Sequence, residues 1–242
     1  MKKAFIFNLI TIATLICSQS SKAGTTNTVY WNFNTAAPTS GVFSGLTVSS
    51  LSQGNNHGTT TLISTTSASS GYTTAAGFTA SGTGNAGAAV FTNAPFSTAT
   101  STYFQFDVSL SAAAGAAYQV SQIYDISLGA RATSTGPQLL SLYSSTDDFT
   151  SDFTSIASLS IPNNSAWVAR DFSNIAISLP EDGSTVSFRI YASNGVGNAT
   201  SGTANLRIDD LSFTVSSVPE PSTIALATMG GLACLMAVRR KR

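Results

Sequence analysis

Five aspartates in the second half of the chain are the residues whose chemistry matters most. Asp147, Asp148 and Asp152 fall in one short segment, and Asp209 is followed directly by Asp210. Two carboxyl groups placed on either side of a glycosidic bond can hydrolyse it. Neighbouring residues of a strand point to opposite faces, so neither adjacent pair forms a ready acid and base. We therefore expect no enzyme, and a glycan hydrolase is kept only as an alternative.

The same acids could instead hold a metal ion. Ca²⁺ takes carboxylate and carbonyl oxygens as ligands, and Asp209 and Asp210 have the best position for this because they interrupt the last strand. In the other interpretation, these carboxylates pair with Arg207 or Arg189, or are solvated. We assign no metal ion or cofactor, and Ca²⁺ at Asp209 and Asp210 remains an open alternative.

Two further motifs lack the context that their chemistry needs. His57 is the only histidine, so it cannot build a histidine-rich zinc site, and no serine in a G-x-S-x-G motif accompanies it. Residues 82–87 spell the dinucleotide fingerprint G-x-G-x-x-G. That fingerprint must follow a strand and open a helix. Here the preceding residues are rich in Ser and Thr, and 88–91 resemble a strand, so we expect a loop.

Aromatic side chains could serve as stacking platforms for sugar rings. Trp31 and Trp167 are the candidate ligand-binding residues, and Tyr72, Tyr143 and Tyr191 are also available. The alternative is that these rings are buried between two sheets. The ligand itself cannot be named from the sequence.

The elements that must position these residues are short strands. No long stretch has the apolar period of a helix, whereas Thr, Ser, Val, Phe and Tyr dominate between Gly and Asn breaks. Tyr103–Leu110 alternates most clearly, with Phe104 and Phe106 on one face and Tyr103 and Gln105 on the other. Other strands are expected at 30–33, 118–128, 138–144, 166–172, 175–179 and 184–192. This pattern predicts an all-β, two-sheet sandwich of the jelly-roll type.

A further strand, the last before the C-terminal tail, is expected around residues 206–215, and its apolar pattern contains a change of phase. Leu206 and Ile208 mark one face, whereas Leu211 and Phe213 mark the opposite one. A strand can change faces only by inserting an extra residue. We therefore predict a β-bulge at Asp209-Asp210.

The charges and cysteines are distributed unevenly. Between Gly24 and Glu220 the chain holds four arginines and all 11 acids, which gives a formal charge of 4 − 11 = −7. Such an acidic, lysine-free segment does not favour nucleic acid, whose phosphates require cations. Cys17 and Cys234 lie near the two ends of the chain, so the part between them contains no disulfide. Residues 24–217 are expected to form one domain, with a loop-rich part at 24–102 and the core strands at 103–217.

The N-terminus has the pattern of a secretory signal peptide. Lys2 and Lys3 precede a largely apolar stretch, and small residues come before the expected cleavage site after Ala23. The bulky Ile16 before Cys17 does not fit a lipoprotein signal. Residues 1–23 are therefore expected to be removed, and the domain that follows is expected to be exported through the inner membrane.

The C-terminus combines three features in residues 218–242. Pro219 and Pro221 hold Glu220 in a stiff, extended backbone that another protein can grip. Residues 223–238 carry no charge and would span roughly 24 Å as a helix, against a hydrocarbon core of roughly 30 Å. The basic run Arg239, Arg240, Lys241 and Arg242 follows, which is expected to stay in the cytoplasm. The domain would then lie on the other side of the membrane.

This arrangement resembles the PEP-CTERM protein-sorting tail, whose signature tripeptide falls on Pro219, Glu220 and Pro221. The resemblance implies recognition and cleavage by a membrane peptidase of the exosortase type. It also implies transfer of the domain to the cell surface or to an extracellular exopolysaccharide matrix.

A second resemblance concerns the domain. The order of segments looks like a jelly roll similar to laminin-G or concanavalin-type lectin sandwiches. Residues 103–215, with the runs 131–137, 144–149 and 188–191, resemble domains that accompany this sorting tail. We therefore expect an exported, non-catalytic envelope or matrix protein. The alternatives are a carbohydrate-binding module on the same scaffold and an exported glycan hydrolase.

Overall fold

The computed structural model describes residues 25–80, 82, 84–91, 94–115, 118–196 and 203–219. The expected signal peptide with its cleavage site at Ala23 lies outside these residues. So do Glu220, Pro221, the apolar segment 223–238 and the basic run from Arg239 to Arg242. In the described part of the chain, no helix has the length and apolarity that a membrane crossing requires.

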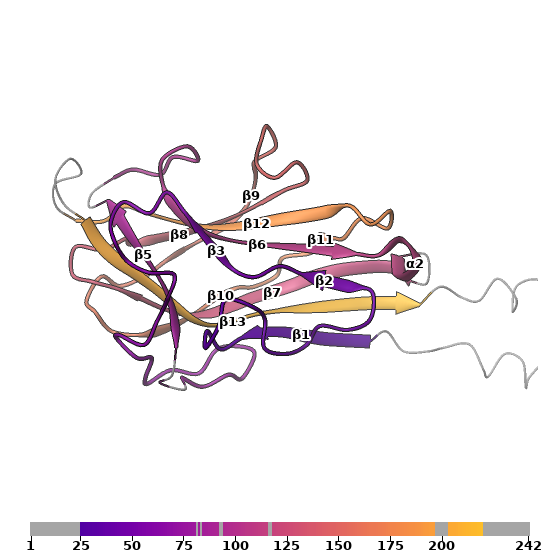
Figure 1. Ribbon diagram of the computed structural model, residues 1–242, viewed down its shortest axis with the longest axis horizontal. Coiled ribbons are helices and arrows are strands. Elements are labelled where there is room, and N and C mark those ends of the chain that lie inside the picture. The colour runs from indigo at the N-terminus through magenta and orange to yellow at the C-terminus, as the bar shows by residue number, and fades with distance from the viewer. Residues whose placement is uncertain are drawn as a thin grey trace, which may run out of the picture.

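The described chain folds into two layered sheets (Figure 1). Sheet A contains β1 (Thr25–Trp31), β4 (Ile63–Ser64), β5 (Asn85–Phe91), β7 (Tyr118–Ala132), β10 (Val168–Phe172), β11 (Ile177–Ser178) and β13 (Thr203–Pro219). Sheet B contains β2 (Leu46–Val48), β3 (Ser52–Gly54), β6 (Thr102–Leu110), β8 (Leu139–Ser145), β9 (Thr154–Ser160) and β12 (Thr185–Ser193). A single helical turn, α2 (Ala112–Gly115), follows β6. The predicted all-β, two-sheet sandwich is confirmed.

The core fills the space between the two sheets. Every second residue of β6 is buried, as the alternation of its sequence predicts, because successive side chains of a strand point to opposite faces. Phe106 shows how the layers meet. Its ring stacks on Phe188 of β12 at 5.2 Å between centroids and on Phe213 of sheet A at 5.6 Å. The apolar face of each strand is thus covered by the opposite sheet.

The predicted β-bulge is present in β13. Asp209 is paired with Gly129 of β7 and Ser212 with Ser127, so two residues of β13 lie opposite a single residue of β7. Asp210 has φ = 49°, which places the extra residue in the left-handed region. Ile208 and Leu211 consequently both point into the core. The side chains of Asp209 and Asp210 are left on the outer side of sheet A.

The bulge also marks the point where β13 changes its neighbour. Residues 203–208 pair with β5, whereas residues 211–217 pair with β1 on the same side. The long segment between β1 and β5 therefore enters the molecule beside Asp209 and Asp210. It includes β4 and a loop, residues 65–80, that we call the cover loop.

Several elements differ from the sequence-based expectation, among them the short strands β2, β3 and β4 in the part that was expected to be loop-rich. β1 begins at Thr25 rather than at residue 30. The strand β9, at the edge of sheet B, was not predicted, because its apolar residues do not alternate regularly with polar ones. Residues 112–115 form a helical turn where a simple alanine-rich link was expected.

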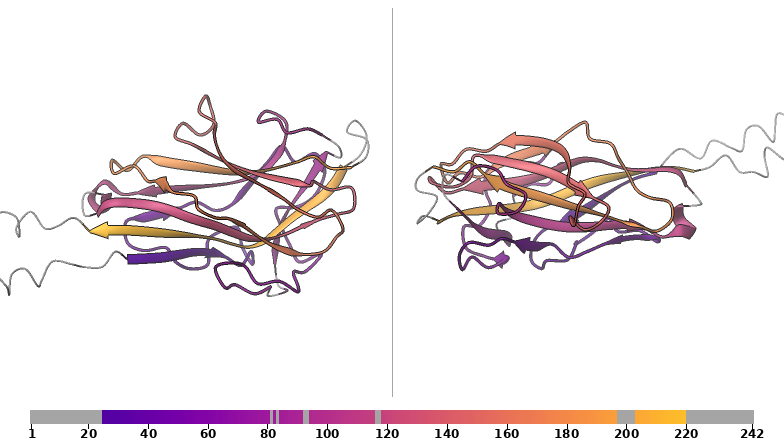
Figure 2. Two further views of the ribbon diagram at one scale, coloured as in Figure 1. Left: turned by 180° about the vertical axis from the view of Figure 1, so that it is seen from behind. Right: turned by 90° about the horizontal axis from the view of Figure 1, so that it is seen from above.

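Both ends of the described chain leave the sandwich on the same side. Thr25 at the start of β1 is paired with Ser217 near the end of β13 (Figures 1 and 2). β13 continues to Pro219, whose register partner is Tyr118 of β7. The first proline of the tripeptide is thus the last residue of a sheet strand, so the tail follows the domain without a linker.

Candidate functional site

The outer side of sheet B gathers aromatic and charged side chains from strands that are distant in sequence. The register places Gln105 of β6, Arg189 of β12 and Tyr143 of β8 in one row across the sheet. In the next row Tyr103 of β6 lies beside Tyr191 of β12. We call this surface the outer tyrosine face; it comprises Phe96, Tyr103, Gln105, Asp107, Tyr143, Asp148, Phe149, Arg189 and Tyr191.

Tyr191 is the centre of its aromatic cluster. Its ring is fully buried and meets Tyr103, Phe96 and Tyr143 edge-on, at 5.3, 5.5 and 5.6 Å between centroids. Phe96 stacks in turn on Tyr143 at 5.3 Å. Burial raises the pKa of the Tyr191 hydroxyl, and the neighbouring Arg189 opposes this shift. The surrounding three rings are only half-buried, so they form the accessible part of the cluster.

Arg189 is held by contacts on both faces of its guanidinium group. The group lies 4.0 Å from the ring centroid of Tyr103 and 4.2 Å from that of Phe149, and both contacts are cation–π interactions. Its Nε donates to Gln105 Oε1 at 2.7 Å, and Nη1 donates to the Tyr191 hydroxyl at 3.3 Å. Among the described residues, these two hydrogen bonds use two of the five N–H groups of Arg189. The other N–H groups of the guanidinium are available to a ligand.

Gln105 connects this arginine to two carboxylates. Its Nε2 donates to Asp107 Oδ1 at 3.2 Å and to Asp148 Oδ1 at 2.8 Å. Asp148 is exposed and Asp107 is half-buried, so both can still accept hydrogen bonds from outside. Half-exposed rings beside an arginine, an amide and carboxylates can recognise a polyhydroxylated ring by stacking and hydrogen bonding.

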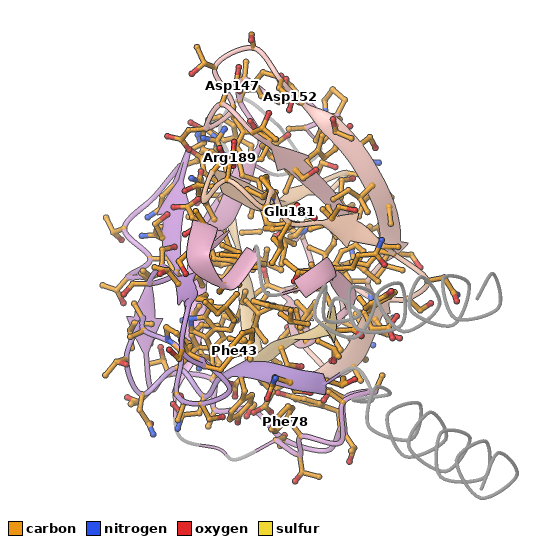
Figure 3. All side chains as sticks on the ribbon, turned by 90° about the vertical axis from the view of Figure 1, so that its right-hand side faces the viewer. Phe43, Phe78, Asp147, Asp152, Glu181 and Arg189 are labelled. Atoms are coloured by element: carbon orange, nitrogen blue, oxygen red, sulfur yellow. The ribbon has the colours of Figure 1, made fainter. Side chains whose placement is uncertain are left out.

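The loop that carries Asp148 is fixed by its neighbour Asp147. The Asp147 carboxylate accepts hydrogen bonds from the hydroxyls of Ser145 and Ser151 at 2.8 and 2.6 Å. It also accepts from the backbone N–H groups of residues 150, 151 and 152. The Ser151 and Ser145 hydroxyls hold the pKa of Asp147 well below its usual range. Figure 3 shows Asp147 and Asp152 at the end of the molecule where Arg189 lies, and the same loop contacts Arg189 through Phe149 and Gln105 through Asp148.

The predicted calcium candidates occupy the opposite side of the molecule. Asp209 and Asp210 are fully buried on the outer side of sheet A, beneath the cover loop. The Tyr30 hydroxyl donates to Asp210 Oδ1 at 2.6 Å, and the Tyr72 hydroxyl donates to Asp210 Oδ2 at 2.8 Å. Burial raises the pKa of both tyrosines. Two hydroxyl donors thus satisfy the Asp210 carboxylate in this arrangement.

The carboxylate of Asp209 is less well satisfied. Its Oδ1 accepts from the backbone N–H of Asp210 at 2.8 Å, whereas Oδ2 is buried without a partner among the described residues. Burial raises the pKa of Asp209 to about 7, the Ser69 hydroxyl opposes this shift, and the charge of Asp210 adds to it. Asp209 therefore holds a proton more tightly than an ordinary aspartate. Among the described residues, no three His, Cys, Asp or Glu side chains are grouped closely enough to hold a metal ion.

The cover loop is attached to sheet A at several points. Tyr72 lies so closely over Gly129 that a Cβ on this glycine would come 2.1 Å from the Tyr72 ring carbon Cζ. Thr66 accepts a hydrogen bond from Nη2 of Arg207 at 3.0 Å. Arg207 is almost fully buried, and this burial, followed by the charge of Arg131, lowers its pKa. The attachment is thus made largely of buried polar groups.

The two tryptophans that the sequence proposed for sugar stacking lie elsewhere than on the outer tyrosine face. Trp31 is fully buried between the sheets, tilted against Phe106 at 5.4 Å and Phe213 at 5.8 Å, so its ring has no face for a ligand. Trp167 is half-buried beside Tyr72 and donates from Nε1 to the Ser67 carbonyl at 3.1 Å, which ties it to the cover loop. The burial of Trp31 contradicts its predicted role as a stacking platform, whereas the role predicted for Trp167 stays a prediction.

Other sequence motifs have structural positions. His57 stacks on Phe91 at 3.6 Å, and its Nε2 lies 2.8 Å from the carbonyl oxygen of Thr100. Residues 85–91, within and after the glycine-rich run, form β5 rather than a helix, so the dinucleotide fingerprint lacks its required context. The predicted loop therefore applies only to the part of the run that precedes β5, which begins at Asn85.

Sequence reasoning did find the outward residues of the separate strands. It placed Tyr103 and Gln105 on one face of their strand, opposite Phe104 and Phe106. It could not find that Tyr103 faces Tyr191, or that Gln105 and Tyr143 flank Arg189, because these contacts depend on the register between strands. One signal could have indicated this surface. Residues 103–110 and 184–192 both alternate between apolar and polar residues, and both polar faces carry aromatic or cationic side chains.

Comparisons with known proteins give two kinds of result. No curated protein matches the sequence significantly. Among solved structures, similarity is found to the K1 adhesin domain of Lys-gingipain from Porphyromonas gingivalis, at 11% identity and a TM-score of 0.35, over 77% of this chain and 96% of that chain. A xylan-binding domain of carbohydrate-binding module family 22 gives 12% identity and a TM-score of 0.39, over 82% of this chain and 97% of that one. A tandem of two family 22 modules from Paenibacillus barcinonensis gives 13% and 0.40, over 83% of this chain and 48% of that one.

The tail gives the more specific result. Residues 217–242 match the PEP-CTERM protein-sorting motif. Such a motif indicates export, with the C-terminus anchored in the membrane before processing, and it implies processing by an exosortase. The chain therefore carries a PEP-CTERM sorting motif behind an all-β, two-sheet sandwich.

Proposed function

We propose that this is an exported, non-catalytic protein of the cell envelope or extracellular matrix, cleaved at its tail, that binds glycan through the outer tyrosine face. The sorting motif supports delivery to the outside of the cell. The finer parts of this proposal are cleavage by an exosortase-type peptidase, a final location at the cell surface or in the matrix, and association with exopolysaccharide.

One observation carries the glycan-binding part. Two strands, β6 and β8, and the loop that carries Phe96 present partly exposed rings next to hydrogen-bonding groups of both kinds, donors on Arg189 and acceptors on Asp107 and Asp148. Sugars offer apolar ring faces together with hydroxyl groups that both donate and accept. Rings that are already packed against one another lose little side-chain entropy when a ligand binds, so such a face is pre-organised.

The positions of the acids support a non-catalytic role. The Asp147 carboxylate is occupied by donors from its own loop, and Asp209 and Asp210 are buried beneath the cover loop, away from substrate. A glycosidase needs two accessible carboxyl groups on either side of the scissile bond. Asp107 and Asp148 both accept hydrogen bonds from the Gln105 amide, which engages one oxygen of each carboxylate.

Tyr143→Ala tests the proposed function. Tyr143 is half-buried, borders the accessible edge of the face and supports Phe96. Its loss is expected to weaken binding by at least about tenfold, as is typical when a tyrosine that contacts the ligand is truncated. The measurement is binding of the exported protein to a glycan array that includes exopolysaccharide from the producing cells.

The matched control is Tyr124→Ala. Tyr124 is also half-buried, but it lies on β7 in sheet A, far from the outer tyrosine face. This variant should bind like the wild type. Equal binding by the two alanine variants, or a wild-type protein that binds no glycan on the array, would remove the proposed function.

A further inference from the structure

We infer that the outer tyrosine face selects uncharged polysaccharide, recognised through pairs of adjacent hydroxyl groups, and rejects polymers of uronic acid. This inference rests on the proposed function, because it names the class of glycan that the same site takes. Two features of the face support it: the balance of its charges and the contacts that hold Arg189.

The charge balance of the face is negative. Arg189 contributes the single positive charge of the nine residues that form it, whereas Asp107 and Asp148 contribute two negative charges. The whole segment between Gly24 and Glu220 carries 4 − 11 = −7. A polymer with a carboxylate on each sugar would meet like charges both at the face and during approach, and such juxtaposition opposes binding.

Arg189 is not free to act as a flexible anion clamp. The Tyr103 and Phe149 rings cover both faces of its guanidinium group, and Gln105 fixes Nε. An incoming carboxylate could reach only the free edge of the guanidinium group. Asp107 and Asp148 are close to Arg189, because the Gln105 amide is hydrogen-bonded to all three side chains. The planar fork of N–H groups on that edge can donate to the two oxygens of a carboxylate or to two adjacent hydroxyls, so the neighbouring carboxylates, and not the fork itself, discriminate between the two ligands.

The remaining polar groups complement hydroxyls rather than carboxylates. A hydroxyl can accept a hydrogen bond from Arg189 and donate one to Asp148, because it is both donor and acceptor. A carboxylate can only accept, so in the same position it would offer Asp148 no further donor and would add repulsion. An arginine beside two carboxylates therefore distinguishes neutral from acidic sugars.

Affinity electrophoresis of the exported protein tests this selectivity. The neutral probes are hydroxyethylcellulose and dextran, the acidic probes are polygalacturonate and alginate, and mobility is normalised to gels without polymer. The wild type is expected to be retarded by at least one neutral polymer and by neither acidic one. The double variant Asp107→Asn with Asp148→Asn keeps a side-chain carbonyl at each position but removes both charges. Its affinity for polygalacturonate should rise by at least about tenfold. Its affinity for the neutral polymers should change by a smaller factor.

A matched double variant controls for net charge. Glu181→Gln with Asp182→Asn removes two carboxylates from an exposed turn that ends just before β12, and it should leave both affinities unchanged. Wild-type binding to an acidic polymer at least as tight as to the neutral ones would overturn the inference and leave the proposed function standing. Binding to neither class would overturn both.

Discussion

The wild-type protein is expected to lose stability as the pH rises from 4 to 8, and Asp209→Asn is expected to prevent most of that loss. Burial raises the pKa of Asp209 to about 7 in the folded protein, against 3.8 for an ordinary aspartate. Asparagine keeps the acceptor for the Asp210 N–H but cannot ionise. The buried Oδ2, which has no partner among the described residues, is the atom on which this effect depends.

The sign of this effect follows from proton linkage. The unfolded chain releases the Asp209 proton near pH 4, whereas the folded protein keeps it until about pH 7. Between these values the folded state binds more protons, so stability falls as pH rises and the whole contribution is lost above about pH 7. A shift of about three units corresponds to an upper limit of about 4 kcal/mol, and we expect about 2–4 kcal/mol for this buried group.

The measurement is urea unfolding of the exported protein at pH 4.5, 6 and 8. The difference in unfolding free energy between Asp209→Asn and the wild type should grow in favour of the variant as pH rises. Glu181→Gln, in an exposed turn, loses the same charge and should show no such trend. A variant that is destabilised by the same amount at all three values would mean that Asp209 is ionised in the folded protein throughout.

Trp31→Ala is expected to lower the free energy of unfolding by about 3–5 kcal/mol, as is usual when a fully buried tryptophan is truncated. Trp31 packs against Phe106 of sheet B and Phe213 of sheet A, so its loss opens a cavity between the sheets. Trp31→Phe should cost much less, because it keeps most of the ring volume and deletes an indole N–H that has no partner among the described residues.

Trp167→Ala provides the comparison. It removes one half-buried ring and one hydrogen bond to the Ser67 carbonyl, so we expect a loss of about 1 kcal/mol. Chemical denaturation of the three variants gives these values directly. Neither Trp31→Phe nor Trp167→Ala should weaken glycan binding, since neither residue belongs to the outer tyrosine face. Loss of binding by Trp167→Ala with unchanged stability would move the binding site to the cover loop.

Periodicity in the sequence predicted the layers of the fold well. Alternating apolar residues identified β6 and β12, and the conflict between Ile208 and Leu211 located the bulge to the residue pair. These signals are local, because the side chains of a strand alternate whatever it pairs with. The serine-rich β9 was not predicted because its three apolar residues, Ile156, Ala157 and Leu159, do not alternate regularly with polar ones, although they pack against the core.

The functional surface could be predicted only in part. The contacts of Arg189 with Tyr103 and Phe149 join β12 to β6 and to a loop 40 residues away, and only the register brings them together. The fate of the acids was equally non-local. Whether Asp210 faces solvent, a cation or tyrosine hydroxyls depends on where the cover loop crosses sheet A, and nothing near residue 210 encodes that path.

The junction between domain and tail links the fold to processing. β13 remains paired with β7 up to Pro219, so a cut before that residue would shorten a strand at the edge where both ends of the described chain leave the sandwich. A cut within residues 219–223 would release the complete sandwich and leave behind the apolar segment and the basic run. The fold therefore favours cleavage at the tripeptide or directly after it.

The most direct test of this account is the mass of the C-terminal peptide of protein harvested from outside the producing cells. We predict a C-terminus within residues 219–223, after removal of the segment 223–238 or nearly all of it. Extracellular protein that still extends to Arg242 would contradict the account, because the motif would then act as a simple anchor rather than as a processed sorting signal.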